Sequence, residues 1–213
     1  MKLAKSLDRL GTESAFAILA EAKKLEAQGK EMIHLGLGQP DFKTPQHVSD
    51  AAKKAIDDGH HGYVLANGIL ECRQAVTRKI KKLYNKDISP ERIMIMPGGK
   101  PTMYYAIQMI GEPGAEIVHP TPGFPIYESM INYTGAKAVP YDLTKEKDLK
   151  FDPEKILSLI TDKTRLVILI NPNNPTGSFV DKPEIDKLAD GLKKHPHVTI
   201  LSDEIYSRQV FDG

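Results

Sequence analysis

The sequence predicts an α/β fold in which helices cover both faces of a mainly parallel sheet, giving a three-layer α/β/α arrangement. Short apolar runs alternate with stretches of helical periodicity over the second half of the chain, a pattern typical of parallel strands joined by helices. Two polar motifs each directly follow such a run: NPNNPTG (171–177) follows LVILI, and SDEIY (202–206) follows VTIL. Because ligands bind outside the carboxyl ends of such strands, both motifs should line one site.

Three helices are predicted ahead of this alternation. The first spans 14–28, and the second has Thr44 as N-cap and Pro45 as its first residue and ends at Gly59. The third spans 68–84. Their apolar positions, which predict the buried faces, are Ile18, Ala22 and Leu25, then Val48, Ala51, Ala52, Ala55 and Ile56, then Ile69, Val76, Ile80 and Leu83.

The alternating part of the chain predicts further elements. Strands are expected at 93–96, 115–118, 137–141, 166–170 and 198–201, and helices near 101–111, 124–134, 153–161 and 182–194. Asp152 followed by Pro153 marks a helix start. Residues 141–152, rich in Lys and Asp, are expected to form a solvated loop. Met94, Met96, Met103 and Met109 fall at predicted core positions.

Composition excludes several classes of protein. Of 213 residues, 40% are apolar and 27% are charged, and 29 basic side chains against 28 acidic ones give a net charge of +1. No basic block is present, so the sequence lacks the electrostatic signature of nucleic-acid binding. One cysteine excludes an intrachain disulfide, and His195 and His197 lack a third ligand for a metal site. With no signal peptide or long apolar run, we expect a soluble cytoplasmic protein.

The residues at the predicted strand ends suggest a particular ligand. Asn174, Asp203 and Tyr206 would bring an amide, a carboxylate and a phenol to one small polar ring, and this set suits pyridoxal phosphate (PLP).

The segment MPGGKPTM (96–103) follows a predicted strand and leads into a helix with Pro101 as its first residue. Gly98 and Gly99 would let a phosphate approach the helix N-terminus, where the first amides and the helix dipole favour an anion. A plain strand-to-helix turn would give the same pattern.

Both strand-end motifs resemble the cofactor-binding motifs of the fold-type I PLP-dependent aminotransferases (aminotransferase class I/II, aspartate aminotransferase family). The similarity extends to HLGLGQPDFKTP (34–45), HGYVLANGI (61–69), MPGGKPTM and PTPGFPIYES (120–129), so that it covers essentially all of residues 1–213. It implies a truncated large domain of the PLP-dependent transferase type over 46–213, with 1–45 as the N-terminal segment of a small domain. The family is nearly twice as long, and its Schiff-base lysine and its arginine for the substrate α-carboxylate fall beyond residue 213. We therefore expect this N-terminal half to be inactive by itself.

The resemblance also implies roles for individual residues. Gly98, Gly99 and Lys100 would hold the PLP phosphate, and Phe124 would stack on the ring. Asp203 would pair with the protonated pyridine nitrogen, and Asn174 and Tyr206 would bind the phenolic oxygen, which makes Asp203 and Tyr206 the catalytic residues of this half. Tyr63 would reach the PLP phosphate of the partner subunit in a homodimer, and Gly38 would lie beside the substrate.

The implied activity is transfer of an amino group between an amino acid and a 2-oxo acid. Another fold-type I reaction, a C–S lyase or a decarboxylase, uses the same cofactor cradle, because the cofactor carries the hard chemistry. A non-catalytic PLP-binding or ligand-binding fragment is a third reading. The residues present do not identify the amino donor.

Overall fold

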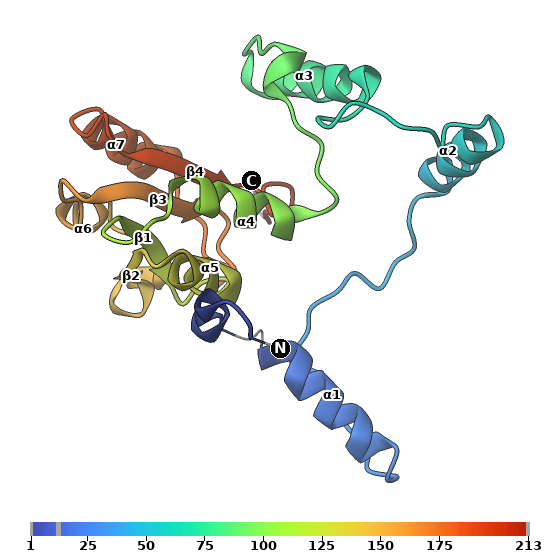
Figure 1. The fold of residues 1–213 in the computed structure, drawn as a ribbon, viewed down its shortest axis with the longest axis horizontal. Coiled ribbons are helices and arrows are strands. Elements are labelled where there is room, and N and C mark those ends of the chain that lie inside the picture. The colour runs from blue at the N-terminus through green and yellow to red at the C-terminus, as the bar shows by residue number, and fades with distance from the viewer. Residues whose placement is uncertain (1, 12–13, 212–213) are drawn as a thin grey trace. The chain divides into compact units, whose positions relative to one another are not determined.

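The computed structural model describes residues 2–11 and 14–211 and divides the chain into two compact units. One unit comprises residues 14–99, and the other comprises residues 1–13 together with 100–213 (Figure 1).

The unit 14–99 contains the three helices predicted for it. They are α1 (Ser14–Glu26), α2 (Gln46–Asp57) and α3 (Leu70–Tyr84), followed by the 3₁₀ turn η2 (Pro90–Arg92). The predicted start of α2 is wrong by one residue: Pro45 occupies the N-cap, and no side chain caps this helix. Gly59 follows the end of α2 with φ +83°, a backbone conformation that glycine adopts without strain.

The predicted buried faces of these helices are largely wrong. In α2 no residue is buried, and Ile56 is 68% exposed. In α3 the buried residue is Arg73, whose guanidinium donates to the carbonyl oxygens of Gly68 and Pro90 at 3.1 and 3.0 Å. Within the described part of this unit, the three helices make no extensive contact with one another. An amphipathic pattern predicts a buried face only where an apolar surface lies opposite it.

The other unit is built on a four-stranded parallel sheet, which confirms the predicted fold class. The strands are β1 (Glu116–Thr121), β2 (Lys137–Asp142), β3 (Thr164–Ile170) and β4 (Thr199–Asp203), in the order β2-β1-β3-β4. The predicted strand at 93–96 is wrong. Ile95 N–H donates to the Asn67 carbonyl at 3.1 Å, but no described strand pairs with this segment, and Met94 is 64% exposed. An apolar run becomes a strand only when a neighbouring strand satisfies its backbone.

Helices cover both faces of the sheet, as predicted (Figure 1). They are α4 (Gly99–Ile110), α5 (Pro125–Thr134), α6 (Pro153–Ser158) and α7 (Lys182–Leu192). Because side chains alternate along a strand, Ile117 of β1 packs with residues of α4 and α5 while its neighbour Val118 packs with residues of α6 and α7. The first cluster also contains Met103, Ile107, Tyr127, Met130, Ile131, Leu166 and Ile168, and the second contains Tyr141, Leu143, Phe151, Ile156, Val167 and Leu188.

The ends of these helices follow local chemistry. Asp152 caps α6, where its Oδ1 accepts the Glu154 N–H at 2.9 Å and Pro153 is the first helical residue, as predicted. Helix α4 begins at Gly99, two residues before the Pro101 that was predicted to start it. Of the methionines assigned to the core, Met103 is buried in α4, whereas Met109 of the same helix is 80% exposed.

Residues 141–152 are less solvated than predicted. They contain the end of β2 and two 3₁₀ turns, η3 (Leu143–Lys145) and η4 (Lys147–Leu149). The Leu143 and Phe151 side chains are only 2% and 7% exposed and join the core beside α6 and α7. Two apolar side chains anchor a segment whose other residues are mostly charged.

The N-terminal segment packs against α5. The 3₁₀ turn η1 (Lys5–Arg9) presents Arg9, whose guanidinium donates to the carbonyl oxygens of Asn132 and Tyr133 at 2.7 Å each. These carbonyls belong to the last turn of α5, where a cation is favoured. The Gly11 N–H donates to Ser129 Oγ at 2.9 Å.

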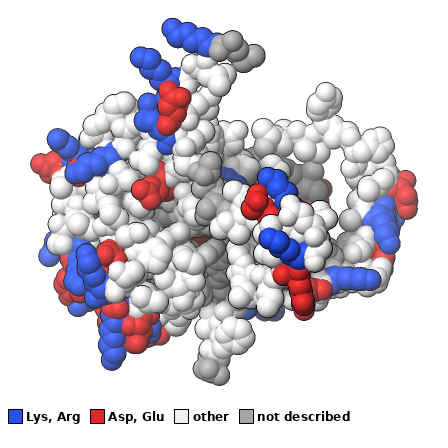
Figure 2. All heavy atoms as spheres, turned by 90° about the horizontal axis from the view of Figure 1, so that it is seen from below, with Lys and Arg blue, Asp and Glu red and all other residues white. Residues whose placement is uncertain are grey.

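Charged side chains of both signs lie close together on the face shown in Figure 2. Ion pairs of the chain include Lys54 with Asp58 at 2.6 Å and Lys81 with Asp87 at 2.6 Å. Within the described ranges, no helix combines the length and apolar character that crossing a bilayer requires.

Candidate functional site

The site lies at the edge of the sheet where the parallel strands end. Strand β1 leads to Phe124, β3 leads to the NPNNPTG loop with Asn174, and β4 ends at Asp203, shortly before Tyr206. The strands β3 and β4 are neighbours with Ile170 opposite Asp203, so the segments that follow them emerge side by side.

The NPNNPTG loop is held by hydrogen bonds to its own backbone. The Asn171 side chain donates to the Val180 carbonyl at 3.0 Å and accepts the Val180 N–H at 2.9 Å. It therefore pairs with both backbone groups of Val180, as the backbone of a neighbouring strand does, and closes the loop. Inside the loop, Asn173 N–H donates to the Ser178 carbonyl and Gly177 N–H to the Asn173 carbonyl, each at 2.9 Å. Gly177 has φ +68°. The loop therefore presents Asn174 from a fixed backbone.

Asn174 and Tyr206 meet at this edge, although 32 residues separate them. Asn174 Nδ2 donates to the Tyr206 hydroxyl oxygen at 3.0 Å, and both residues are half-buried. The structure thus brings together the amide and the phenol that were predicted from the motifs to bind one oxygen.

Asp203 is half-buried and is held through both carboxylate oxygens. Its Oδ2 accepts the Tyr127 O–H at 2.5 Å, and its Oδ1 accepts the Ile205 N–H at 3.1 Å. Tyr127 is 1% exposed, and burial, followed by the hydrogen bond to Asp203, raises the pKa of its phenol above the ordinary value. Tyr127 is therefore a permanent donor, and the carboxylate keeps further lone pairs for a ligand.

Phe124 lies directly before α5 and is half-buried. Its ring packs edge-to-face on Tyr127, with the centroids 6.3 Å apart and the ring planes at 80°. The Lys100 ammonium lies 5.8 Å from the centroid of the Phe124 ring. This geometry allows a weak cation–π interaction between the first turn of α4 and the start of α5.

Gly98 and Gly99 lead into α4. Gly98 has φ +99°, which strains any residue with a Cβ, and Gly99 is the first helical residue. Helix α4 therefore directs its first amides toward this turn, a suitable arrangement for an anion.

Gly38 and Tyr63 belong to the unit 14–99, and both are exposed. A Cβ built on Gly38 would meet no atom within 4 Å, and the Tyr63 ring is fully exposed.

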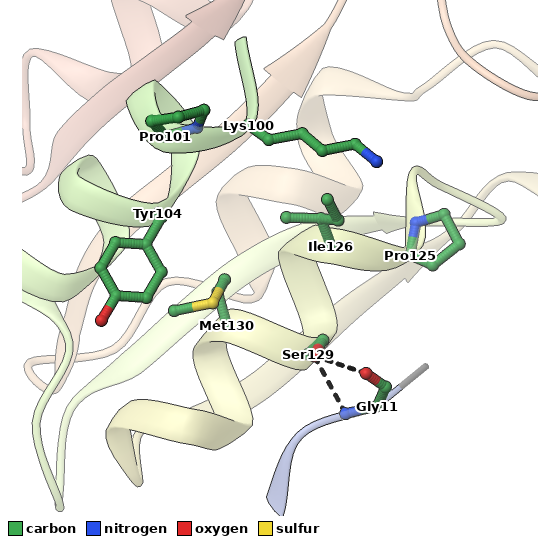
Figure 3. Close-up of a pocket in the computed structure, with 8 residues that line it drawn as sticks. All are labelled: Gly11, Lys100, Pro101, Tyr104, Pro125, Ile126, Ser129 and Met130. Atoms are coloured by element: carbon green, nitrogen blue, oxygen red, sulfur yellow. Dashed lines mark hydrogen bonds between the residues drawn. The ribbon is translucent and has the colours of Figure 1, made fainter. Parts of the chain in front are cut away.

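A hollow of about 390 Å³ lies between α4 and α5 (Figure 3). It is lined by Gly11, Lys100, Pro101, Tyr104, Pro125, Ile126, Ser129 and Met130. Two hydrogen bonds between Ser129 Oγ and the Gly11 backbone, at 2.9 and 3.2 Å, bring the N-terminal segment to its rim.

The side chains at the strand edge fit PLP chemically. The half-buried Asp203 carboxylate suits a protonated ring nitrogen, the Asn174–Tyr206 pair suits an oxygen, and Phe124 offers an aromatic face. The turn into α4 suits a phosphate.

No role was predicted for Tyr127 from the sequence. Its spacing from Phe124 was a usable signal, because residues three apart on a helix lie on one face, and a buried tyrosine hydroxyl normally has a partner. The identity of that partner, Asp203, depends on the tertiary fold.

Comparison with known proteins gives a consistent result. Residues 30–213 match the family described as aminotransferase class I and II. The chain is 35% identical to an aspartate aminotransferase from Bacillus subtilis (strain 168) over 213 residues, which is 100% of the chain and 54% of that relative. It is 34% identical over 210 residues to an aspartate/prephenate aminotransferase from Cereibacter sphaeroides, with 99% and 52% covered.

Solved structures agree with this. The Thermus thermophilus aspartate aminotransferase with maleate matches with a TM-score of 0.94 and 30% identity over 100% of this chain and 56% of that one. The Pyrococcus furiosus alanine aminotransferase matches with a TM-score of 0.92 and 30% identity, covering 100% and 54%.

The chain spans about half the length of the curated relatives it matches. The family match covers most of its residues, including every one at the strand edge. The chain therefore belongs to the aminotransferase class I and II family, a family of PLP-dependent enzymes.

Proposed function

We propose that residues 1–213 form the cofactor cradle of an enzyme that transfers an amino group between an amino acid and a 2-oxo acid. The observation that carries the proposal is the convergence of the Asn174–Tyr206 pair and the Tyr127-held Asp203 at one sheet edge. The relatives named as aspartate aminotransferases support it and make aspartate the first donor to test.

In this proposal each residue acts on a defined part of PLP. The chemistry supplied by bound PLP is that of an electron sink for the carbon that carries the amino group. The Asp203 carboxylate holds a proton on the ring nitrogen, because an opposite charge nearby favours the protonated form. Asn174 and Tyr206 hydrogen-bond the ring oxygen, and Phe124 covers one face of the ring.

The phosphate is assigned to the start of α4. There Gly98 and Gly99 allow close approach of the backbone, and Lys100 adds a positive charge. The proximity of the Lys100 ammonium to the Phe124 ring supports placing ring and phosphate contacts in one site.

The proposal includes a homodimer in which Tyr63 contacts the PLP phosphate of the partner subunit and Gly38 lies beside the substrate. The full exposure of the Tyr63 ring is compatible with such a contact. The molecular mass in solution, measured on protein expressed from its whole reading frame, tests this assembly.

The test of the cradle uses the same protein. PLP binding is followed by absorbance in the unaltered protein, in Asp203→Ala and in Asp190→Ala, an exposed aspartate paired with Lys193 at 2.6 Å. Asp203→Ala should weaken PLP binding by at least about tenfold and abolish amino transfer, because loss of a charged hydrogen-bond partner costs about 1.5–3 kcal/mol. Asp190→Ala should leave both unchanged.

The assay also separates the possible reactions. Amino transfer from aspartate to a 2-oxo acid is the expected activity, whereas release of pyruvate or carbon dioxide without an acceptor would indicate a lyase or decarboxylase. Binding of PLP without turnover would indicate a PLP-binding protein that has no catalytic activity. Unimpaired PLP binding and turnover in Asp203→Ala would refute the assignment of the site.

A further inference from the structure

Tyr127 connects two parts of the candidate site that are far apart in the chain. It lies in the first turn of α5, and its hydroxyl donates to Asp203 Oδ2 at 2.5 Å, across 76 residues of sequence. Its ring also packs edge-to-face on Phe124. One buried side chain therefore contacts both the carboxylate and the aromatic that the proposed function assigns to the cofactor ring.

The position of the Tyr127 hydroxyl is determined by packing. The side chain is 1% exposed and belongs to the core cluster that contains Ile117, Ile131 and Ile168. A close-packed ring has little freedom to move, and a tyrosine hydroxyl is coplanar with it. Burial also keeps the phenol protonated, because it raises the pKa. The hydroxyl is thus a fixed donor rather than an adaptable one.

The Asp203 carboxylate would be mobile without such a donor. The terminal torsion of an aspartate has a broad energy minimum, so the carboxylate plane is weakly defined by the backbone. The Ile205 N–H restrains one oxygen and Tyr127 restrains the other. Two donors on different oxygens define the plane and leave the remaining lone pairs in a set direction.

We propose that Tyr127 is a positioning residue that orients the Asp203 carboxylate toward the ring nitrogen of bound PLP. The inference rests on the proposed function, because it concerns the same site. Since Tyr127 also contacts Phe124, it fixes the positions of the Asp203 carboxylate and the Phe124 ring relative to each other.

The test compares two buried tyrosines in protein expressed from its whole reading frame. Tyr127→Phe removes the hydroxyl that contacts Asp203. Tyr141→Phe is the matched control, because Tyr141 is 5% exposed and its hydroxyl donates to the Ile168 carbonyl at 3.0 Å. Each variant loses one hydrogen bond donated by a buried tyrosine, but only one of these bonds holds Asp203.

Tyr127→Phe should weaken PLP binding by about three- to tenfold, less than Asp203→Ala does, because the carboxylate remains but is less well oriented toward the ligand. The absorbance of bound PLP should also show loss of the ring-nitrogen proton at a lower pH, because a less well oriented carboxylate stabilises that proton less. Tyr141→Phe should change the affinity by less than about twofold and leave the pH profile unaltered.

The outcomes distinguish the two proposals. If the unaltered protein does not bind PLP, the proposed function fails and the positioning role fails with it. If it binds PLP and Tyr127→Phe keeps the same affinity and pH profile, only the positioning role is overturned. A ring nitrogen that holds its proton to a higher pH in Tyr127→Phe would also overturn it, since the phenol would then be weakening the charge of Asp203 rather than directing it.

Discussion

His119 in β1 is a buried side chain with an unmatched polar atom. It is 3% exposed, its Nδ1 lies 3.2 Å from the Pro120 carbonyl oxygen, and its buried Nε2 has no hydrogen-bond partner among the described residues. Burial lowers the pKa of the imidazole, and the nearby Glu128 carboxylate opposes this effect only in part. The folded protein therefore favours the neutral ring.

Because of His119, the unfolding free energy should decrease as the pH is lowered. The unfolded chain takes up a proton near the ordinary histidine pKa of about 6.5, whereas the folded chain does so only at lower pH, so protonation favours unfolding below that value. We expect the unfolding free energy, measured with urea, to decrease less between about pH 7.5 and pH 5.5 in His119→Leu than in the unaltered protein. An identical dependence in His119→Leu would contradict the assignment.

At the scale of an element, different asparagines of the NPNNPTG loop stabilise the loop and face the candidate site. Asn171 makes two hydrogen bonds to the Val180 backbone and closes the loop, while Asn174 turns its amide to Tyr206. The two asparagines lie three positions apart, yet one maintains the loop and the other faces the site. The motif therefore combines a structural and a functional requirement.

The two asparagines should respond differently to truncation. Asn171→Ala should lower the unfolding free energy by about 1–3 kcal/mol, because two hydrogen bonds of about 0.5–1.5 kcal/mol each are lost. Asn174→Ala should cost less than about 1 kcal/mol and should instead weaken PLP binding. Urea denaturation and PLP titration of both variants check this. A larger loss of stability in Asn174→Ala than in Asn171→Ala would mean that Asn174, and not Asn171, supports the loop.

At the scale of the whole molecule, the sheet separates two hydrophobic clusters. Ile107 of α4 lies in one and Ile156 of α6 in the other, and both are fully buried. The sheet between them contributes alternate side chains to each cluster, so the two faces share strands but not side-chain contacts. Packing on one face is therefore expected to be energetically independent of packing on the other.

Matched substitutions on the two faces test this independence. Ile107→Val and Ile156→Val should each lower the unfolding free energy by about 0.5–1.5 kcal/mol. The double variant should lose the sum of the two to within about 0.5 kcal/mol, as expected for distant sites without common partners. A coupling energy above about 1 kcal/mol in this double-mutant cycle would show that the faces are not independent.

The sequence by itself determined the fold class, four of the five predicted strands and the motifs that end at one edge of the sheet. Apolar runs, Asp152 before Pro153 and the polar segments with Asn174 and Asp203 are local signals, and the parallel order of strands converts them into a shared site. Local patterns suffice where a few neighbouring residues carry the preference.

Only the tertiary structure decided which distant groups meet. It placed the Tyr127 hydroxyl on Asp203, buried His119 without a described partner for Nε2, and drew Leu143 and Phe151 into the core. It also left residues 93–96 outside the described sheet. The physical reason is common to these cases: burial, strand pairing and a side-chain hydrogen bond each require a partner from elsewhere in the chain, and local sequence does not specify that partner.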